Sequence, residues 1–168
     1  MRILVATDHW SPDHRGGAAR VAAETASLLA RRGHDVDVIA PAVPGRPRLW
    51  RDDSLVVHRV LPRSVLPQTL SDPVQTYLAA RAREADLAVA HTSTTAIGLS
   101  LALRRTPLAV VFHASAAREA AFERSRTTRT QRRAATALLE PVLRLLERSS
   151  LRRAERVLVL SEFSRSLL

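Results

Sequence analysis

The chain contains neither cysteine nor lysine. Without cysteine it can form no disulfide and no thiolate metal site, and its composition is compatible with a reducing compartment. Without lysine, all 26 basic residues are arginine, and a Walker phosphate loop, which needs Gly-Lys-Ser/Thr, is excluded. Biased coding DNA is the simpler explanation for the missing lysines. A partner that selects for positive charge is the other explanation. The net charge of +10 is present in both cases and suits an anionic partner.

Long hydrophobic runs are also missing. No apolar stretch approaches the roughly 18 residues that span a bilayer. The apolar start at residues 3–6 is too short for a signal peptide, and Asp8 interrupts it. We therefore expect a cytoplasmic protein, with peripheral membrane contact as the alternative.

Six short β-type runs, several of them nearly continuously apolar, alternate with helical patterns. The runs are residues 2–7, 35–41, 54–62, 85–91, 106–113 and 155–161. Continuous apolar runs are typical of strands that are buried on both faces. The alternation predicts an α/β fold: one Rossmann-like, doubly wound parallel sheet of about six strands with helices on both faces. The length of 168 residues favours one domain.

Three boundaries can be predicted more closely. Asp72 is a candidate N-cap, with Pro73 in the first turn of the following helix. Pro141 is expected to kink or divide the helical segment 116–154. Residues 41–50 are expected to form a long surface loop between the second and third strands.

Polar side chains follow several of the predicted strands. In open α/β sheets, ligands bind beyond the carboxyl ends of the strands. Those ends carry Asp8 after the first strand, His91 and Thr92 after the fourth, and Ser161 with Glu162 after the sixth. We therefore expect these groups to gather along one edge of the sheet.

Gly16 and Gly17 stand side by side before the first helix. The loop is too long for a dinucleotide fingerprint and lacks its third glycine. Free backbone N–H groups at a helix N-terminus suit an anion such as a phosphate, and glycine permits close approach. The pair is therefore either half of a phosphate site or only a permissive turn.

His113 ends the fifth predicted strand, and His91 ends the fourth. The two imidazoles are candidates to flank one cleft, where they would titrate near neutrality or hydrogen-bond substrate hydroxyls. A satisfied structural histidine is the alternative for each. No metal site is expected, because no histidines are spaced four apart on one helix and cysteine is missing.

The segment 118–156 is rich in arginine, with leucines beside the arginines. Such a basic amphipathic helix can lie on anionic lipid. It can equally pack its leucines on the sheet and solvate its arginines. Nucleic acid is not expected as a partner, because aromatic residues make up only 4% of the chain and no recognition motif is present.

Taken together, these motifs resemble the family-4-like group of retaining GT-B glycosyltransferases. The resemblance rests on four segments: the N-terminal run with its Gly-Gly loop and "RRGHDVDVIAP", then "ADLAVAH", "PLAVVFHAS" and "AERVLVLSEFSRSLL". The similarity spans nearly the whole chain. It departs from the family at "FHAS", where a glycine or an acidic residue often follows the histidine.

The resemblance implies that residues 1–168 form the N-terminal, acceptor-side domain of such an enzyme. Gly16 and Gly17 would approach the donor diphosphate, and His113 would be the catalytic-site residue near the donor sugar. His91, Thr92 and Asp8, with Ser161 and Glu162, would face the acceptor, which would be a sugar, a lipid or another small molecule.

In the family, a C-terminal nucleotide-sugar-binding domain with a Glu-x7-Glu motif completes the enzyme, and nothing in this sequence matches it. The resemblance implies catalysis without a metal or cofactor. We expect the chain to be inactive alone. The alternative is a non-catalytic binding or membrane-docking module that kept the fold, and a free-standing nucleotide-binding enzyme is disfavoured by the failed fingerprints.

Overall fold

The computed structural model describes residues 1–168 except 61–67, 116, 119–120, 123–124, 126–129 and 167–168. Within the described residues, seven strands form one sheet in the order β3-β4-β2-β1-β5-β6-β7. The strands are β1 (Arg2–Ala6), β2 (Asp35–Pro41), β3 (Leu49–Asp52), β4 (Leu55–Val60), β5 (Leu87–Ala90), β6 (Leu108–Phe112) and β7 (Arg156–Val159). The helices are α1 (Gly17–Arg31), α2 (Gln68–Ala80), α3 (Ser93–Ala102), α5 (Thr130–Arg153) and α6 (Glu162–Arg165).

The predicted α/β fold class is confirmed. Every neighbouring pair of strands is parallel except β3 with β4. In the central strand β1, Ile3 to Ala6 are all buried, as an apolar strand covered on both faces must be.

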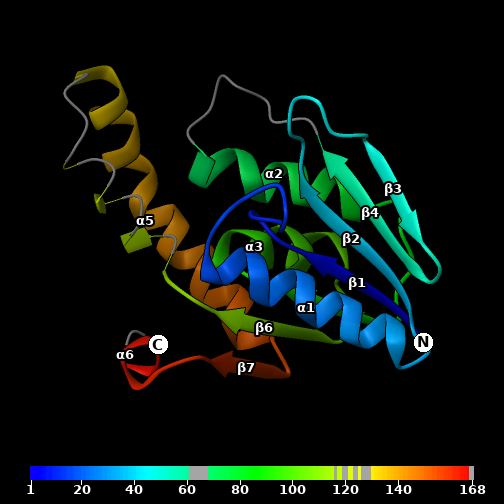
Figure 1. Ribbon diagram of the computed structural model, residues 1–168. Coiled ribbons are helices and arrows are strands. Elements are labelled where there is room, and N and C mark those ends of the chain that lie inside the picture. The colour runs from blue at the N-terminus through cyan, green and yellow to red at the C-terminus, as the bar shows by residue number, and fades with distance from the viewer. Residues whose placement is uncertain (61–67, 116, 119–120, 123–124, 126–129, 167–168) are drawn as a thin grey trace.

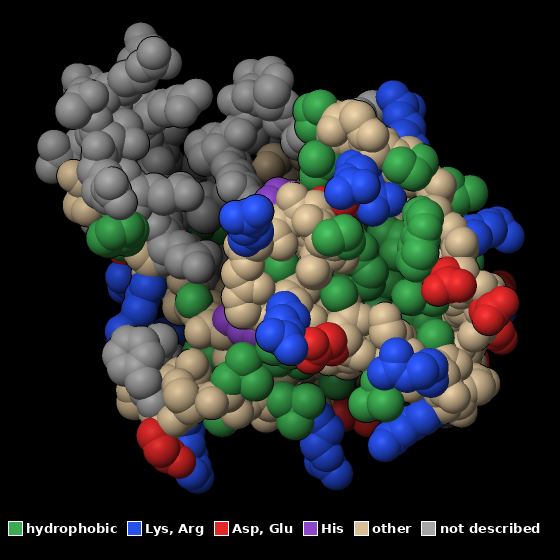
Figure 2. All heavy atoms as spheres, viewed as in Figure 1, with side chains coloured by type: hydrophobic (Ala, Val, Ile, Leu, Met, Phe, Trp, Pro, Cys, Tyr) green, Lys and Arg blue, Asp and Glu red, His purple; other side chains and the backbone are tan. Residues whose placement is uncertain are grey.

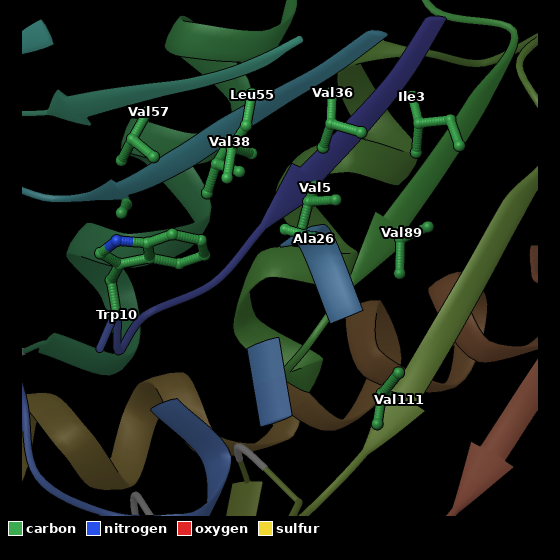
Figure 3. Close-up of a cluster of buried hydrophobic side chains, with 11 residues drawn as sticks. Ile3, Val5, Trp10, Ala26, Val36, Val38, Leu55, Val57, Val89 and Val111 are labelled. Atoms are coloured by element: carbon green, nitrogen blue, oxygen red, sulfur yellow. The ribbon is translucent and has the colours of Figure 1, made fainter. Parts of the chain in front are cut away.

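One face of the sheet is covered by α1, which lies in front of the strands in Figure 1. Its buried Ala26 packs in a cluster with Val36 and Val38 of β2. Trp10, in the loop after β1, joins the same cluster, and Figure 3 shows its indole beside Val38 and Val57. The loop that leaves β1 is therefore fastened to the core by a large apolar side chain.

The opposite face is covered by α2, α3 and α5, of which α3 packs against both of the others. The approach of α2 to α3 is close at Gly98. A Cβ atom on Gly98 would lie 2.6 Å from both the Pro73 carbonyl oxygen and Thr76 Cβ. Only glycine fits there without a shift of one helix.

The structure corrects the three predicted boundaries. Residues 41–50 are not one loop, because Pro41 ends β2 and Leu49 begins β3, which turns back antiparallel onto β4 through Asp53 at φ 47°. Asp72 does not cap a helix, because α2 already begins at Gln68 and contains Pro73. Helix α5 runs through Pro141, so the proline does not divide it, and the alternative of a kink stays a prediction.

The order of the strands reverses between β1 and β5. The chain builds β1, β2 and β4 outward in one direction and then returns to place β5 on the other side of β1. At such a switch point the connecting helices leave on opposite faces, which opens a crevice at the carboxyl edge of the sheet. Ala6 of β1 lies opposite Ala90 of β5 there, so the residues after both strands meet at this crevice.

Candidate functional site

His91, directly after β5, is fully buried at the crevice. Neither of its ring nitrogens has a hydrogen-bond partner among the residues that the structure describes. Burial, and to a smaller extent the nearby His113, lower the pKa of His91 to about 4, whereas Asp8 opposes the shift. The imidazole is therefore neutral at pH 7, with one donor and one acceptor nitrogen both free.

His113, after β6, lies beside His91. The centroids of the two rings are 6.2 Å apart and their planes are tilted by 31°. The buried Nε2 atom of His113 also has no partner within the described part of the chain. Burial lowers the pKa of His113, against the raising effect of Asp8. The structure thus brings together the two imidazoles that the sequence placed at adjacent strand ends.

Such unpaired nitrogens are unusual in a folded interior. Buried polar atoms nearly always have a partner, since leaving one unpaired costs about 1–3 kcal/mol. Three such atoms lie on two neighbouring rings here. They are buried polar atoms at the carboxyl edge of the sheet whose hydrogen bonds the described chain does not supply.

Asp8 lines a small hollow of about 20 Å³ on the side of β1 that faces α2 and α3. Its Oδ1 atom lies 2.9 Å from Nδ1 of His9. The carboxylate acts electrostatically on His91 and His113, because it raises the pKa of both. Asp8 therefore lies at the carboxyl edge of the sheet with an acidic charge, and its role toward a substrate stays a prediction.

Gly16 and Gly17 begin α1 on the same edge of the sheet. Gly16 has φ 148°, which favours glycine, and no side chain caps the helix. No acidic residue lies in the first turn, and a Cβ on either glycine would meet no atom of the described residues within 4 Å. The positive end of the helix dipole therefore faces open space.

A buried ion pair holds this glycine loop in place. Asp13, whose side chain is 1% exposed, accepts a hydrogen bond from Nε of Arg59 at 2.7 Å. The half-exposed Arg46 contacts the other carboxylate oxygen at 3.0 Å. The sequence analysis missed this cluster, although an arginine inside the apolar strand pattern of β4 was a visible signal.

Thr92 and Ser161 serve as helix caps. The Thr92 hydroxyl accepts a hydrogen bond from the Thr95 N–H in a capping box on α3. The Ser161 hydroxyl accepts one from the Ser164 N–H and caps α6. Both caps fix loops at the carboxyl edge of the sheet.

The α6 turn is joined to His113 through a backbone contact. The Ser164 hydroxyl donates to the His113 carbonyl oxygen at 3.4 Å. Glu162, by contrast, has a side chain that is 90% exposed, and it lies 3.8 Å from Arg165. Of the two polar residues predicted after the last strand, Ser161 therefore orders the loop, and Glu162 faces solvent.

A second missed contact lies behind His113. The buried Ser115 hydroxyl donates to Oε2 of Glu147 at 2.8 Å, which ties the loop after β6 to α5. Sequence spacing gave no signal for it, because the two residues are 32 positions apart in separate elements.

Much of the arginine-rich segment 118–156 lies outside the described residues or has undescribed side chains. On the face drawn in Figure 2, arginines stand at separate places with acidic side chains between them. Among the described helices, none is long and apolar enough to cross a membrane.

Comparison with known proteins gives the fold a family. The sequence profile of Glycosyltransferase Family 4 matches residues 15–168. No individual curated protein matches the chain in sequence.

The solved structures that resemble it include sucrose-phosphate synthase from Thermosynechococcus elongatus, at a TM-score of 0.70 and 13% identity. This match covers 99% of the chain but 44% of that enzyme. A second structure of the synthase matches at a TM-score of 0.54 and 12% identity, and this match covers 99% of the chain and 95% of that structure. The catalytic domain of starch synthase IV from Arabidopsis thaliana, bound to ADP and acarbose, matches at a TM-score of 0.51 and 17% identity, covering 67% of the chain and 33% of that protein.

Proposed function

The chain belongs to Glycosyltransferase Family 4, and from this premise we propose that it is the acceptor-side half of a glycosyltransferase. The enzyme transfers a sugar from a nucleotide-sugar donor to a hydroxyl of a sugar, lipid or small-molecule acceptor, with retention at the anomeric carbon. The observation that carries the proposal is the pair of neighbouring neutral imidazoles after β5 and β6, with three buried nitrogens that no described residue pairs. Sugar hydroxyls supply both donors and acceptors for such nitrogens.

The glycine loop provides one wall for the donor diphosphate. The first turn of α1 offers free N–H groups, and nothing crowds Gly16 or Gly17. A phosphate can therefore approach the backbone closely and interact with the positive end of the helix. A second, nucleotide-binding domain supplies the remaining contacts, which agrees with a chain that spans 44% of the synthase.

In the reaction, the bond between the anomeric carbon and the leaving diphosphate oxygen breaks, and a bond to the acceptor oxygen forms on the same face. The acceptor proton passes to the leaving diphosphate, so no protein base, metal or cofactor is required. His113 holds hydroxyls of the donor sugar. His91 and Asp8 face the acceptor, and the loops capped by Thr92 and Ser161 shape its site, with Glu162 at the exposed rim.

The alternative is a non-catalytic binding or membrane-docking module that kept the fold. The net charge of +10 favours it, because an anionic surface would attract the chain. The two candidates differ in whether the crevice turns over a substrate.

The test is transfer of labelled sugar by the protein expressed from the complete reading frame that contains these residues. We expect transfer by that protein and none by residues 1–168 alone. His113→Ala should lower kcat by about 100-fold or more, and His34→Ala, which changes a histidine after α1, should not. Sugar transfer by residues 1–168 alone would contradict the proposal that the chain is one half of the enzyme. No transfer by the protein from the complete reading frame would favour the non-catalytic module.

A further inference from the structure

A groove lies at the other end of the strands, away from the crevice. It has a volume of about 920 Å³ and runs between α2, α3 and α5. Val74 and Tyr77 of α2 form one wall, and Leu143 and Leu146 of α5 form the other. Ile97 of α3 lies between them. The volume lies in the range of about 300–1,000 Å³ that is typical of small-molecule sites.

Arginines gather at one end of this groove. Arg81 and Arg83 follow α2, and Arg104 and Arg105 follow α3, so all four stand where both helices end, before β5 and β6. None of them forms an ion pair with a described residue. The nearby acids Glu84 and Asp86 are engaged by Arg2 at the edge of the sheet, at 2.9 and 3.7 Å.

Hydrogen bonds to the carbonyl groups near the C-terminal ends of α2 and α3 engage only some of these arginines. Arg83 donates to the Ala79 carbonyl oxygen of α2. In the turn after α3, Arg153 donates to the Leu103 oxygen and, at 2.8 Å, to the Thr106 oxygen. Arg104 and Arg105 line the groove and form no ion pair with a described residue, so their charge can attract an external anion.

A further arginine, Arg153, lies next to the groove without lining it. Its Nη1 atom is buried and has no hydrogen-bond partner in the described part of the chain. The guanidinium contacts Leu103 and Thr106, both of which line the groove. Cationic groups on one side and aliphatic walls on the other match a molecule with an anionic head and an apolar tail.

We propose that this groove binds a single-chain anionic amphiphile of the fatty-carboxylate type. The head group lies among the arginines, and the chain extends between α2 and α5 toward Pro73. A single chain fits a hollow between helices, whereas a membrane surface is contacted by a protruding apolar face. This site is independent of the proposed transfer reaction and lies at the opposite end of the strands.

The test follows the ring signals of Tyr77, the one tyrosine in the chain, by NMR during titration with decanoate below its micelle concentration. We expect a saturable shift. The double variant Arg104→Glu/Arg105→Glu should weaken binding by roughly 10-fold or more, because two attractions become repulsions. The matched control, Arg31→Glu/Arg32→Glu, changes an arginine pair at the end of α1 and should stay within about twofold.

A second pair of variants tests the apolar wall. Leu101→Glu should abolish the shift, whereas Leu28→Glu on α1 should retain it; the two leucines are 42% and 43% exposed. Decyltrimethylammonium should give no saturable shift.

Three results would overturn the proposal. They are equal binding of the cationic amphiphile, no saturation by decanoate, or self-association of the chain that Leu101→Glu removes. The last result would make the groove an interface between copies. None of these results bears on the crevice, so the two proposals fail separately.

Discussion

The two ends of the parallel strands carry opposite kinds of surface. The carboxyl end has two buried imidazoles with nitrogens that no described residue pairs, and a separate hollow of about 20 Å³ that Asp8 lines. At the amino end, a groove of about 920 Å³ has aliphatic walls and unpaired arginines. The comparison shows that the volume of a hollow and the chemistry of its lining residues are independent indications of a binding site. The large groove favours an apolar chain, whereas the small crevice concentrates the polar groups that a sugar needs.

The largest effect is expected at the ion pair that holds the glycine loop. Asp13→Ala leaves the buried Arg59 guanidinium without its carboxylate, and should lower the free energy of unfolding by about 3–5 kcal/mol in urea denaturation. Arg46→Ala removes a half-exposed partner of the same carboxylate and should cost less than about 1 kcal/mol. Similar losses for both variants would mean that burial does not distinguish the two contacts.

The helix pair beside the amino-end groove should respond differently from the glycine loop. Gly98→Ala places a Cβ against the Pro73 backbone and should destabilise the chain by about 2–3 kcal/mol, as overpacking does. Gly17→Ala, in open space at the start of α1, should leave stability unchanged or raise it by about 0.5 kcal/mol. Thermal or urea unfolding of the two variants checks this, and an unaffected Gly98→Ala protein would refute the close helix approach.

Acid should weaken the carboxyl end through His91. The folded chain holds the pKa of His91 at about 4, below the value of 6.5 expected when unfolded. The unfolded state therefore binds the proton more readily as the pH falls from 6.5 to 4, and about 2–3 kcal/mol of stability is lost over that window. His91→Gln should flatten this part of the pH dependence. Urea midpoints at a series of pH values measure it, and parallel curves for the two proteins would contradict a buried neutral His91.

The smallest effect on folding is expected for Gly17→Val. The isolated chain should lose less than about 1 kcal/mol, because nothing lies within 4 Å of the added Cβ. Transfer by the product of the complete reading frame should fall by at least roughly tenfold, because the bulkier side chain keeps the diphosphate from the backbone. A large loss of stability instead would make the glycine structural.

The sequence predicted the sheet well because its inner strands are continuously apolar. It failed at β3, where Leu49 and Trp50 are exposed at the edge of the sheet and carry no buried pattern. It also failed at α2, where Pro73 suggested a first turn although the helix begins five residues earlier. Proline is also tolerated inside a helix, so Pro73 did not fix the start of α2.

The candidate site was predictable where it follows from topology. His91 and His113 could be paired because parallel strands end at one edge. The pair Asp13–Arg59 was predictable only in part: an arginine inside the apolar pattern of β4 indicates a buried charge, but its partner lies 46 positions away and follows from the loop geometry after β1. The large groove was also invisible, because the residues that line it come from three helices whose packing no local pattern specifies.

The central claim, that the imidazole pair is a sugar site, is tested most directly by NMR of ¹⁵N-labelled histidine in the 168-residue chain. Panels of monosaccharides and of nucleotide sugars are added in turn. The account predicts saturable shifts of the His91 and His113 ring nitrogens with at least one sugar, while His34, beyond α1, stays unchanged. Equal shifts at His34, or no shift at either buried ring, would contradict it.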